Sequence, residues 1–510
     1  MASAEDRLKN LTSENSETPL GQIPFIFSAS RSAQKEFAAL SMPHRMKVLS
    51  QLRHLIVERA QEISRVISRA TGKPPGEALT TEVMVVADAI LQIEKRAPKA
   101  LGKQRVKTPI TFIGKHSYVE YKPRGVVLVI SPWNFPFMLA MIPVVEALAA
   151  GNSVIMKPSE ETPEVGILME SIFKQLGLPE GTVQVTHGGR LLGEALIESK
   201  PDFVHFTGSV NTGKAIASAT GPLLIPTTLE LGGKDPMIVF EDANIERAVN
   251  GAIWGAFSNA GQVCMSVERL YVENSIYDHF LDRLVEQTSK LKLGTDDSSD
   301  IGPITTSAQF QTIQRQAKAA ISAGAKLLTG QGPDKWNPTS RLIPPMILTD
   351  VTHQMEIMQE ETFGPVLPVM RFDSEEQAIA MANDSRFGLN SSVWTKDTSK
   401  GKRVISKLIT GSALLNDVIL TIANPYLPYG GVKDSGLGSY HADSGIQNLA
   451  IRTAVMTDPG RPLSEINWFP YQGKEELFEE LLKSYWGASR NFAKFGISYL
   501  KLLSKSNDRH

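Results

Sequence analysis

The chain has 510 residues, a length that exceeds one compact core and predicts two or more lobes. With 53 Lys and Arg against 54 Asp and Glu, the net charge of −1 offers no footprint for nucleic acid. A single cysteine excludes an intrachain disulfide, and the polar start carries no apolar signal segment, so we expect a cytoplasmic protein.

The first 100 residues predict long helices. After a polar leader at residues 1–20, apolar positions such as Met46, Leu49, Leu52 and Ile56 recur at helical spacing, with charged residues between them. We expect these helices to serve as packing elements.

The most apolar stretch, residues 125–150, is long enough to be tested as a membrane span. Three prolines and Glu146 interrupt it, and its first residues are β-branched and bounded by turn formers, which indicates a buried strand. We therefore predict a β-α-β unit with a strand at 125–131, a loop at 131–137, a helix at 138–150 ended by Gly151, and a strand at 152–157.

A similar unit follows, with a strand at 202–207 and a helix at 211–220. Alternating strands and helices predict an α/β fold with a parallel sheet covered by helices on both faces. No segment matches the dinucleotide pattern G-x-G-x-x-G. Gly208, Ser209 and Gly213 lie at this strand-to-helix turn, where backbone N–H groups favour a phosphate, but the same residues also suit a simple helix cap.

The single cysteine, Cys264, follows a polar, turn-forming segment that contains Asn259, Gly261 and Gln262. Such a segment favours a loop, which makes Cys264 a candidate nucleophile, although a lone cysteine is more often an inert buried residue. Glu230 precedes it by 34 positions and is a candidate base.

The residues around Cys264 and those around Glu230 resemble the two active-site signatures of the NAD(P)-dependent aldehyde dehydrogenase superfamily. The resemblance extends from about residue 25 to about residue 455. Further matching motifs are W-N-F-P at 133–136, K-P-S-E at 157–160, F-T-G-S at 206–209 and E-T-F-G-P at 361–365. The chain departs at Ser266, where the family usually has Ala, Gly, Cys or Asn. We interpret Ser266 as a change of polarity beside a retained nucleophile.

The resemblance implies an aldehyde dehydrogenase-like α/β fold. Its parts would be a Rossmann-type parallel-sheet cofactor domain, a second α/β catalytic domain, a small β oligomerisation hairpin and a C-terminal amphipathic extension. The corresponding boundaries are residues 1–107 with 124–231, 232–423, 108–123 with 440–458, and 459–510.

The resemblance also implies an NAD site and no metal. Glu160 would lie beside the ribose 2′-hydroxyl and repel a 2′-phosphate, which favours NAD, but NADP stays an alternative because some relatives with this glutamate use both. The implied cofactor-binding residues are Trp133, Lys157, Glu160, Gly208, Ser209, Gly213, Gly232, Glu361 and Phe363.

The implied reaction is the oxidation of an aldehyde to its acid. Cys264 would form a thiohemiacetal, hydride transfer to NAD would leave a thioester, and Glu230 would activate the hydrolytic water. Asn134 and the backbone N–H of Cys264 would stabilise the oxyanion. Lys234 is expected either to tune Glu230 or to be solvated.

Phe135 and Tyr429 are predicted to line the substrate tunnel, but the sequence does not identify the aldehyde. Two alternatives stay open. One is a CoA-acylating or semialdehyde dehydrogenase, which Glu230 disfavours. The other is a catalytically silent binding protein of the same fold, which would tend to have lost the nucleophile or the base.

Strands predicted at 108–114 and 117–122, with a late strand at 451–456, would bridge subunits in the family, so we expect a homodimer or homotetramer. Beyond residue 459 the resemblance ends. Residues 474–487 predict an acidic amphipathic helix and residues 490–505 a basic one. The favoured interpretation is packing on a partner subunit. The alternative is peripheral membrane contact, which would suit a long-chain or apolar aldehyde.

Overall fold

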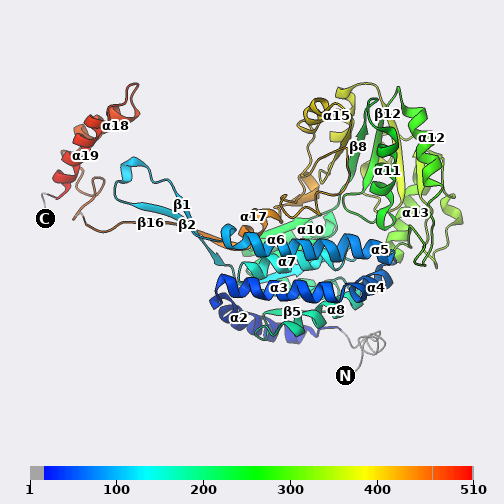
Figure 1. Cartoon of the computed structure of the whole chain (residues 1–510), viewed down its shortest axis with the longest axis horizontal. Coiled ribbons are helices and arrows are strands. Elements are labelled where there is room, and N and C mark those ends of the chain that lie inside the picture. The colour runs from blue at the N-terminus through cyan, green and yellow to red at the C-terminus, as the bar shows by residue number, and fades with distance from the viewer. Residues whose placement is uncertain (1–16, 462, 508–510) are drawn as a thin grey trace. The chain divides into compact units, whose positions relative to one another are not determined.

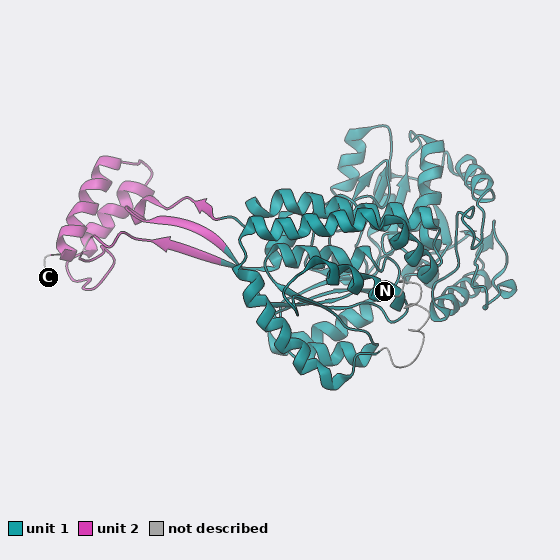
Figure 2. Cartoon of the chain, turned by 60° about the horizontal axis from the view of Figure 1, so that its bottom comes forward, with its two compact units in different colours: residues 1–102, 121–452 teal, residues 103–120, 453–510 magenta. Residues whose placement is uncertain are grey.

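The computed structural model describes residues 17–461 and 463–507, so most of the predicted polar leader lies outside the described part. The chain divides into two compact units (Figure 2). The first contains residues 1–102 and 121–452, and the second contains residues 103–120 and 453–510.

Long helices form the N-terminal layer of the first unit, as predicted (Figure 1). Leu49, Leu52 and Ile56 lie on one face of α3 and are fully buried, because apolar residues at this spacing share one side of a helix. The helices are α2 (Ile23–Ala39), α3 (Met42–Glu58), α4 (Ala60–Thr71), α5 (Pro75–Ala78), the π-helical turn η3 (Leu79–Val83) and α6 (Met84–Ala100).

A six-stranded sheet follows, with the order β15-β7-β6-β3-β4-β5 and all pairs parallel except β15 with β7. The predicted β-α-β unit is confirmed. The strands of the sheet are β3 (Val126–Ile130), β4 (Ser153–Lys157), β5 (Val183–Val185), β6 (Phe203–Thr207), β7 (Thr227–Glu230) and β15 (Gly436–Leu437).

Helices cover both faces of this sheet. Val127 and Val129 of β3 pack in one core with α7, whereas Val126 and Leu128 pack in a second core with α2 and α9, because successive strand residues point to opposite faces. Besides α2, the covering helices are α7 (Met138–Ala149), α8 (Pro163–Phe173), α9 (Arg190–Glu198) and α10 (Val210–Thr220), and the later α17 (Ala442–Asn448) packs on α6 and α7.

The second α/β layer of the first unit is a seven-stranded sheet with the order β10-β11-β12-β9-β8-β13-β14. Its strands are β8 (Asp235–Val239), β9 (Val267–Glu273), β10 (Lys326–Leu327), β11 (Met346–Thr349), β12 (Val366–Phe372), β13 (Ser392–Trp394) and β14 (Leu414–Leu415). Its helices are α11 (Ile245–Phe257), α12 (Tyr277–Thr288), α13 (Ser307–Ser322), α14 (Glu356–Gln359), α15 (Glu375–Asn383) and α16 (Thr398–Ile405).

A three-stranded sheet leads into the second unit, with the order β1 (Gln104–Val106), β2 (His116–Pro123) and β16 (Ala450–Thr457). The strand predicted at 108–114 is wrong. β1 pairs with β2 earlier in the chain, and Ile110–Phe112 forms a 3₁₀ turn after Pro109, which has no N–H to donate to a ladder.

Two helices, α18 (Glu475–Trp486) and α19 (Phe492–Asn507), form a hairpin at the C-terminal end, close to the predicted boundaries. They share a small core that includes Ile466, Leu481, Phe495, Tyr499 and Leu502. None of the helices in the described residues combines the length and the apolar composition that crossing a bilayer requires.

Candidate active site

The segment before Cys264 is a strained turn. After α11 ends, Asn259, Ala260 and Gly261 adopt successive φ values of +49°, +55° and +74°. Left-handed backbone costs free energy at a non-glycine residue and persists only where the surroundings enforce it. A Cβ on Gly261 would collide with the backbone of Gly364, so the sequence needs glycine here.

Cys264 lies where two cavities meet. One cavity, of about 200 Å³, has a polar wall that includes Asn134, Ser209, Glu230 and Glu361. The other, of about 220 Å³, is lined mainly by apolar side chains, and Cys264 borders both. The thiol therefore faces a polar compartment on one side and an apolar compartment on the other.

Burial raises the pKa of the Cys264 thiol to about 12. The Tyr429 hydroxyl lies 3.5 Å from Sγ and lowers this pKa, whereas the carboxyl groups of Asp235, Glu361 and Glu230 raise it. The thiol is consequently protonated at neutral pH, and the nucleophilic thiolate requires a proton acceptor or a positive charge nearby.

Glu230 ends strand β7 and is 2% exposed. Neither of its carboxylate oxygens has a hydrogen-bond partner among the described residues, and burial raises its pKa well above the ordinary value. A carboxyl group in this condition is suited to exchange protons near neutral pH.

Gly232 and Gly233 serve packing rather than a turn. A Cβ on Gly232 would collide with the Glu361 carboxylate, and one on Gly233 would collide with the carbonyl oxygen of Cys264. These glycines let the Glu230 strand approach both segments closely.

Asn134 lies in the W-N-F-P loop and is 3% exposed. Its side-chain nitrogen donates to the carbonyl oxygen of Gln262, 3.1 Å away, in the turn that carries Cys264. An amide nitrogen has two protons, so one remains for an acceptor in the polar cavity. The arrangement fits an oxyanion donor beside the thiol.

The N-terminus of α10 borders the polar cavity through Gly208 and Ser209. The Ser209 hydroxyl oxygen caps the helix by accepting from the backbone N–H of Thr212, 3.3 Å away. Gly213 lies against Leu231. A Cβ at this position would collide with the Leu231 side chain, so the glycine lets α10 pack closely here. The exposed N–H groups of such a helix end fit a cofactor phosphate.

Lys157 ends β4 and Glu160 follows it closely, with Nζ and Oε2 3.1 Å apart. The lysine side chain is buried, and the glutamate side chain is 49% exposed. Glu160 is therefore free to accept from a ribose hydroxyl.

In the wall of the polar cavity, the Glu361 carboxylate accepts from the backbone N–H of Gly233, 3.0 Å away. Burial and the charge of Glu268 raise the pKa of Glu361 to about 8. Phe363 has a φ of +51°, and its ring meets that of Trp133 edge-on, with centroids 5.5 Å apart.

Lys234 is neither solvated nor paired with Glu230. Its ammonium group donates to Glu268, 2.6 Å away, and to the Thr362 hydroxyl, 3.0 Å away. Glu268 also accepts from the backbone N–H groups of Thr362 and Phe363, both at 2.8 Å, and so holds this loop in place. Sequence reasoning missed Glu268, whose only signal was a charged residue in a strand of otherwise mostly buried apolar ones.

Phe135 lines the apolar cavity, whereas Tyr429 is 2% exposed and turns its hydroxyl to the thiol. Ser266 is also buried, and its hydroxyl has no hydrogen-bond partner in residues 17–461 and 463–507. The change of polarity at Ser266 thus leaves an unsatisfied hydroxyl two residues after the nucleophile.

Comparison with known proteins agrees with this geometry. The family model described as the aldehyde dehydrogenase family matches residues 15–455. A 4,4'-diapolycopene aldehyde oxidase from Methylomonas sp is 42% identical over 460 residues, covering 90% of this chain and 86% of that protein. A betaine aldehyde dehydrogenase from Sinorhizobium fredii is 36% identical and covers 85% of this chain and 89% of its own.

Solved structures confirm the predicted aldehyde dehydrogenase-like α/β fold. A betaine aldehyde dehydrogenase from Staphylococcus aureus in complex with NAD+ has a TM-score of 0.83 and 32% identity over 89% of this chain and 90% of that one. An E. coli enzyme described as NADP dependent has a TM-score of 0.82 and 30% identity over 87% and 91%. The chain belongs to the aldehyde dehydrogenase family and is an aldehyde-oxidising oxidoreductase.

Proposed function

We propose that this enzyme oxidises a long, apolar aldehyde to the free acid with NAD, through a thioester on Cys264. The observation that carries this proposal is the position of Cys264 between a polar cavity and an apolar cavity. An aldehyde carbon at the thiol would leave its apolar tail in one cavity and turn its oxygen and hydrogen toward the other.

In the first half of the reaction, Cys264 Sγ bonds to the carbonyl carbon, and the carbonyl electron pair moves to oxygen. Asn134 and the backbone N–H of Cys264 donate to this oxyanion. The thiol proton passes to a base, and Glu230 borders the same cavity. Bound NAD would accept the hydride that leaves the carbon, and the carbonyl of the thioester re-forms.

In the second half, a water oxygen attacks the thioester and the carbon–sulfur bond breaks. Glu230 takes the water proton, since its raised pKa makes its carboxylate a competent base near neutral pH. The departing thiolate then takes this proton from Glu230, so the products are the acid, the restored thiol and the restored carboxylate.

The residues of the polar cavity fit NAD. Gly208 and Ser209 offer a helix N-terminus to the phosphates, while Glu361, Phe363 and Trp133 border the same space near Cys264. Glu160 disfavours a 2′-phosphate by charge, which supports NAD over NADP.

The apolar cavity supports the substrate class. Val85, Phe135, Met138 and Ile419 contribute to its wall, and Trp254 and Leu420, also on the wall, are 42% and 45% exposed. Exposed apolar residues at a cavity suit a tail that continues beyond it. The relative named 4,4'-diapolycopene aldehyde oxidase is consistent with this class.

NADH formation tests the proposal across short, long and aromatic aldehydes, with and without coenzyme A. We expect long apolar aldehydes to have the highest kcat/KM, no requirement for coenzyme A, and loss of activity in Cys264→Ala. Turnover that depends on coenzyme A would instead indicate an acylating dehydrogenase. Failure of every aldehyde in the panel would reject the aldehyde oxidation proposed here.

Narrowing the apolar cavity tests the substrate class separately. Ala423→Phe places a ring in the wall and should lower kcat/KM for long aldehydes by about 10- to 200-fold while sparing short ones. Equal losses for long and short aldehydes would contradict the assignment of this cavity to the tail.

We further propose that the enzyme is a homodimer or homotetramer joined through the outer strand β16. This edge strand exposes Ile451 and Met456, which are 46% and 51% exposed, and an exposed edge favours pairing with another chain. Light scattering coupled to gel filtration measures the mass, and a monomer would contradict this proposal.

The C-terminal hairpin carries an aromatic and basic surface that we propose contacts anionic lipid. Trp486 and Phe492 are 57% and 58% exposed at its turn, and the Arg490 guanidinium lies 5.5 Å from the Tyr485 ring. From residue 483 to residue 507 the chain has five Lys and Arg and no Asp or Glu. Aromatic rings beside cations are typical of residues at a membrane surface.

Co-sedimentation of the full chain with anionic and neutral vesicles tests this contact. We expect binding to anionic vesicles that is lost in Trp486→Ser/Phe492→Ser without a change in oligomer mass. A smaller oligomer in this variant, with no vesicle binding by the wild type, would assign the surface to a partner subunit.

A further inference from the structure

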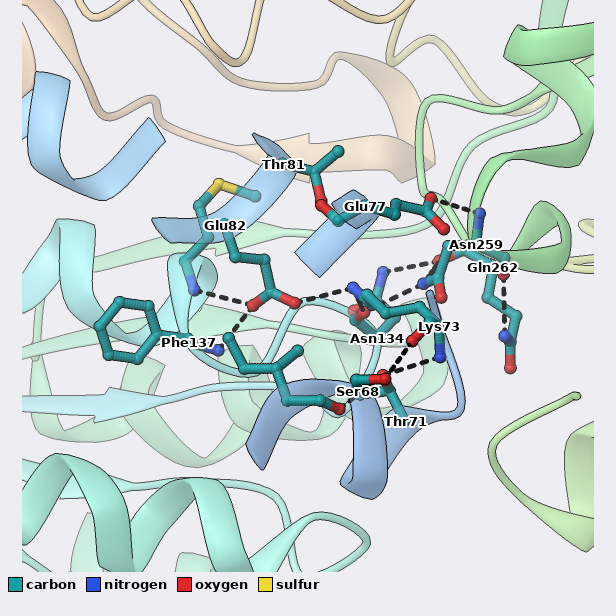
Figure 3. A network of polar contacts seen from close by, with 12 residues as sticks. Ser68, Thr71, Lys73, Glu77, Thr81, Glu82, Asn134, Phe137, Asn259 and Gln262 are labelled. Carbon is teal, nitrogen blue, oxygen red and sulfur yellow. Dashed lines mark hydrogen bonds and ion pairs between the residues drawn. The ribbon is translucent and has the colours of Figure 1, made fainter. Parts of the chain in front are cut away.

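A buried ion pair lies directly behind the W-N-F-P loop (Figure 3). Lys73 and Glu82 have fully buried side chains, and Lys73 Nζ lies 2.7 Å from Glu82 Oε1. Lys73 follows Gly72 in the loop after α4, and Glu82 lies in the π-helical turn η3. Isolated π-helical turns cost stability and frequently mark functional sites.

Each charge of this pair is fully used. The Lys73 ammonium donates to Glu82 and to the backbone carbonyl oxygen of Asn134, 2.8 Å away, and lies 3.8 Å from the centre of the Phe135 ring. The second Glu82 oxygen accepts from the backbone N–H groups of Phe137 and Met138, at 2.9 and 3.1 Å. The pair thus hydrogen-bonds to the backbone on both sides of Phe135, at Asn134 and at Phe137. The Glu82 carboxylate also accepts from the first N–H groups of helix α7.

The same carbonyl oxygen of Asn134 also links to the nucleophile turn. It accepts from the side chain of Asn259 at 3.0 Å, and the side chains of Asn134 and Asn259 both donate to the carbonyl oxygen of Gln262. Glu77, close in the chain to Glu82, accepts from the backbone N–H of Asn259 at 2.6 Å. One hydrogen-bonded network therefore joins Asn134 to Asn259 and Gln262, in the turn that precedes Cys264 (Figure 3).

We propose that Lys73 and Glu82 are positioning residues that hold the Asn134 amide where it stabilises the oxyanion. The inference rests on the proposed role of Asn134. An oxyanion donor must be preorganised to be effective, and a misplacement of about 1 Å can cost about 100-fold in rate. Without the Lys73 ammonium, the carbonyl oxygen of Asn134 would keep, among the described residues, only the bond from the Asn259 side chain.

A double-mutant cycle tests this coupling. Lys73→Met keeps the length of the side chain and removes the charge, and we expect it to lower kcat about 10- to 100-fold with little change in the KM for NAD. In an Asn134→Ala background, where the amide is already absent, we expect the same substitution to lower kcat less than about threefold. Equal losses in both backgrounds would overturn the proposal, because a merely structural role does not depend on the Asn134 side chain.

Two additions keep the test decisive. Lys73→Met/Glu82→Gln, which removes both buried charges together, replaces Lys73→Met in the same cycle if that variant does not fold. Arg53→Met is the control: Arg53 pairs with Glu94 between α3 and α6, at 2.7 Å, and its other side-chain hydrogen bond among the described residues goes to Ser50 of α3. We expect its effect on kcat to be small and the same in both backgrounds.

The single variant Asn134→Ala separates the two levels of the proposal. A loss of about 10²- to 10³-fold in kcat supports the oxyanion role. If that loss is absent, the role of Asn134 fails and the positioning role falls with it. If it is present but Lys73→Met is additive, only the positioning role fails.

Discussion

Two buried carboxylates flank the reactive centre and differ in every contact. Glu82 accepts from one ammonium group and two backbone N–H groups, whereas neither oxygen of Glu230 has a hydrogen-bond partner in the part of the chain that the structure describes. A buried carboxylate whose hydrogen bonds are all made can serve as a fixed support. A buried carboxyl group without hydrogen-bond partners can instead gain or lose a proton near neutral pH.

The loss of Glu230 should have the larger effect on the reaction rate. Glu230→Gln removes the base, so steady-state turnover should fall about 10²- to 10⁴-fold while a burst of NADH equal to the enzyme concentration remains. Stopped-flow absorbance measures both phases. Loss of the burst together with turnover would show that Glu230 is already needed for acylation.

The next effect separates them by stability. Glu82→Gln leaves the Lys73 ammonium buried without its counter-ion and should lower the free energy of unfolding by about 3–5 kcal/mol in urea titrations. The double variant Lys73→Met/Glu82→Gln removes both charges and should lose less than the single one. A single variant as stable as the wild type would show that the pair does not support the fold.

The smallest effect has the opposite sign. Glu230→Gln should raise the free energy of unfolding by about 0.5–2 kcal/mol, because an unpaired carboxyl no longer has to be buried. Since the folded pKa of Glu230 is raised, its native-state contribution is most favourable at low pH and is lost as pH rises through that pKa. The gain in the variant should therefore grow with pH, and a gain that shrinks with pH would contradict the raised pKa.

Sequence patterns were sufficient for the elements whose signals are local. The β-branched run at 125–131 and the helix before Gly151 were placed within a residue or two, because period and turn chemistry act over short distances. The prediction of a strand at 108–114 was wrong. Pro109 has no N–H to donate to a strand ladder, and the residues that pair with β2 are Gln104–Val106.

The motifs named Cys264, Glu230 and Asn134, and the structure places all three on one cavity. Their supporting residues were not predictable in the same way. Lys73 is 61 positions from Asn134, and a lone lysine in a loop is usually solvated, so only the packed fold shows that it is buried against this loop. The expectation of a solvated Lys234 was wrong for the same reason, since Lys234 precedes β8 and its partner Glu268 lies on β9.

The most direct test of a Cys264 thioester hydrolysed by Glu230 is the intact mass of the Glu230→Gln variant after mixing with NAD and a long apolar aldehyde. We predict an added mass equal to that of the acyl group, located on Cys264 by peptide mapping and absent from Cys264→Ala/Glu230→Gln. A variant that turns over at the wild-type rate with no acyl group on Cys264 would contradict thioester hydrolysis by Glu230.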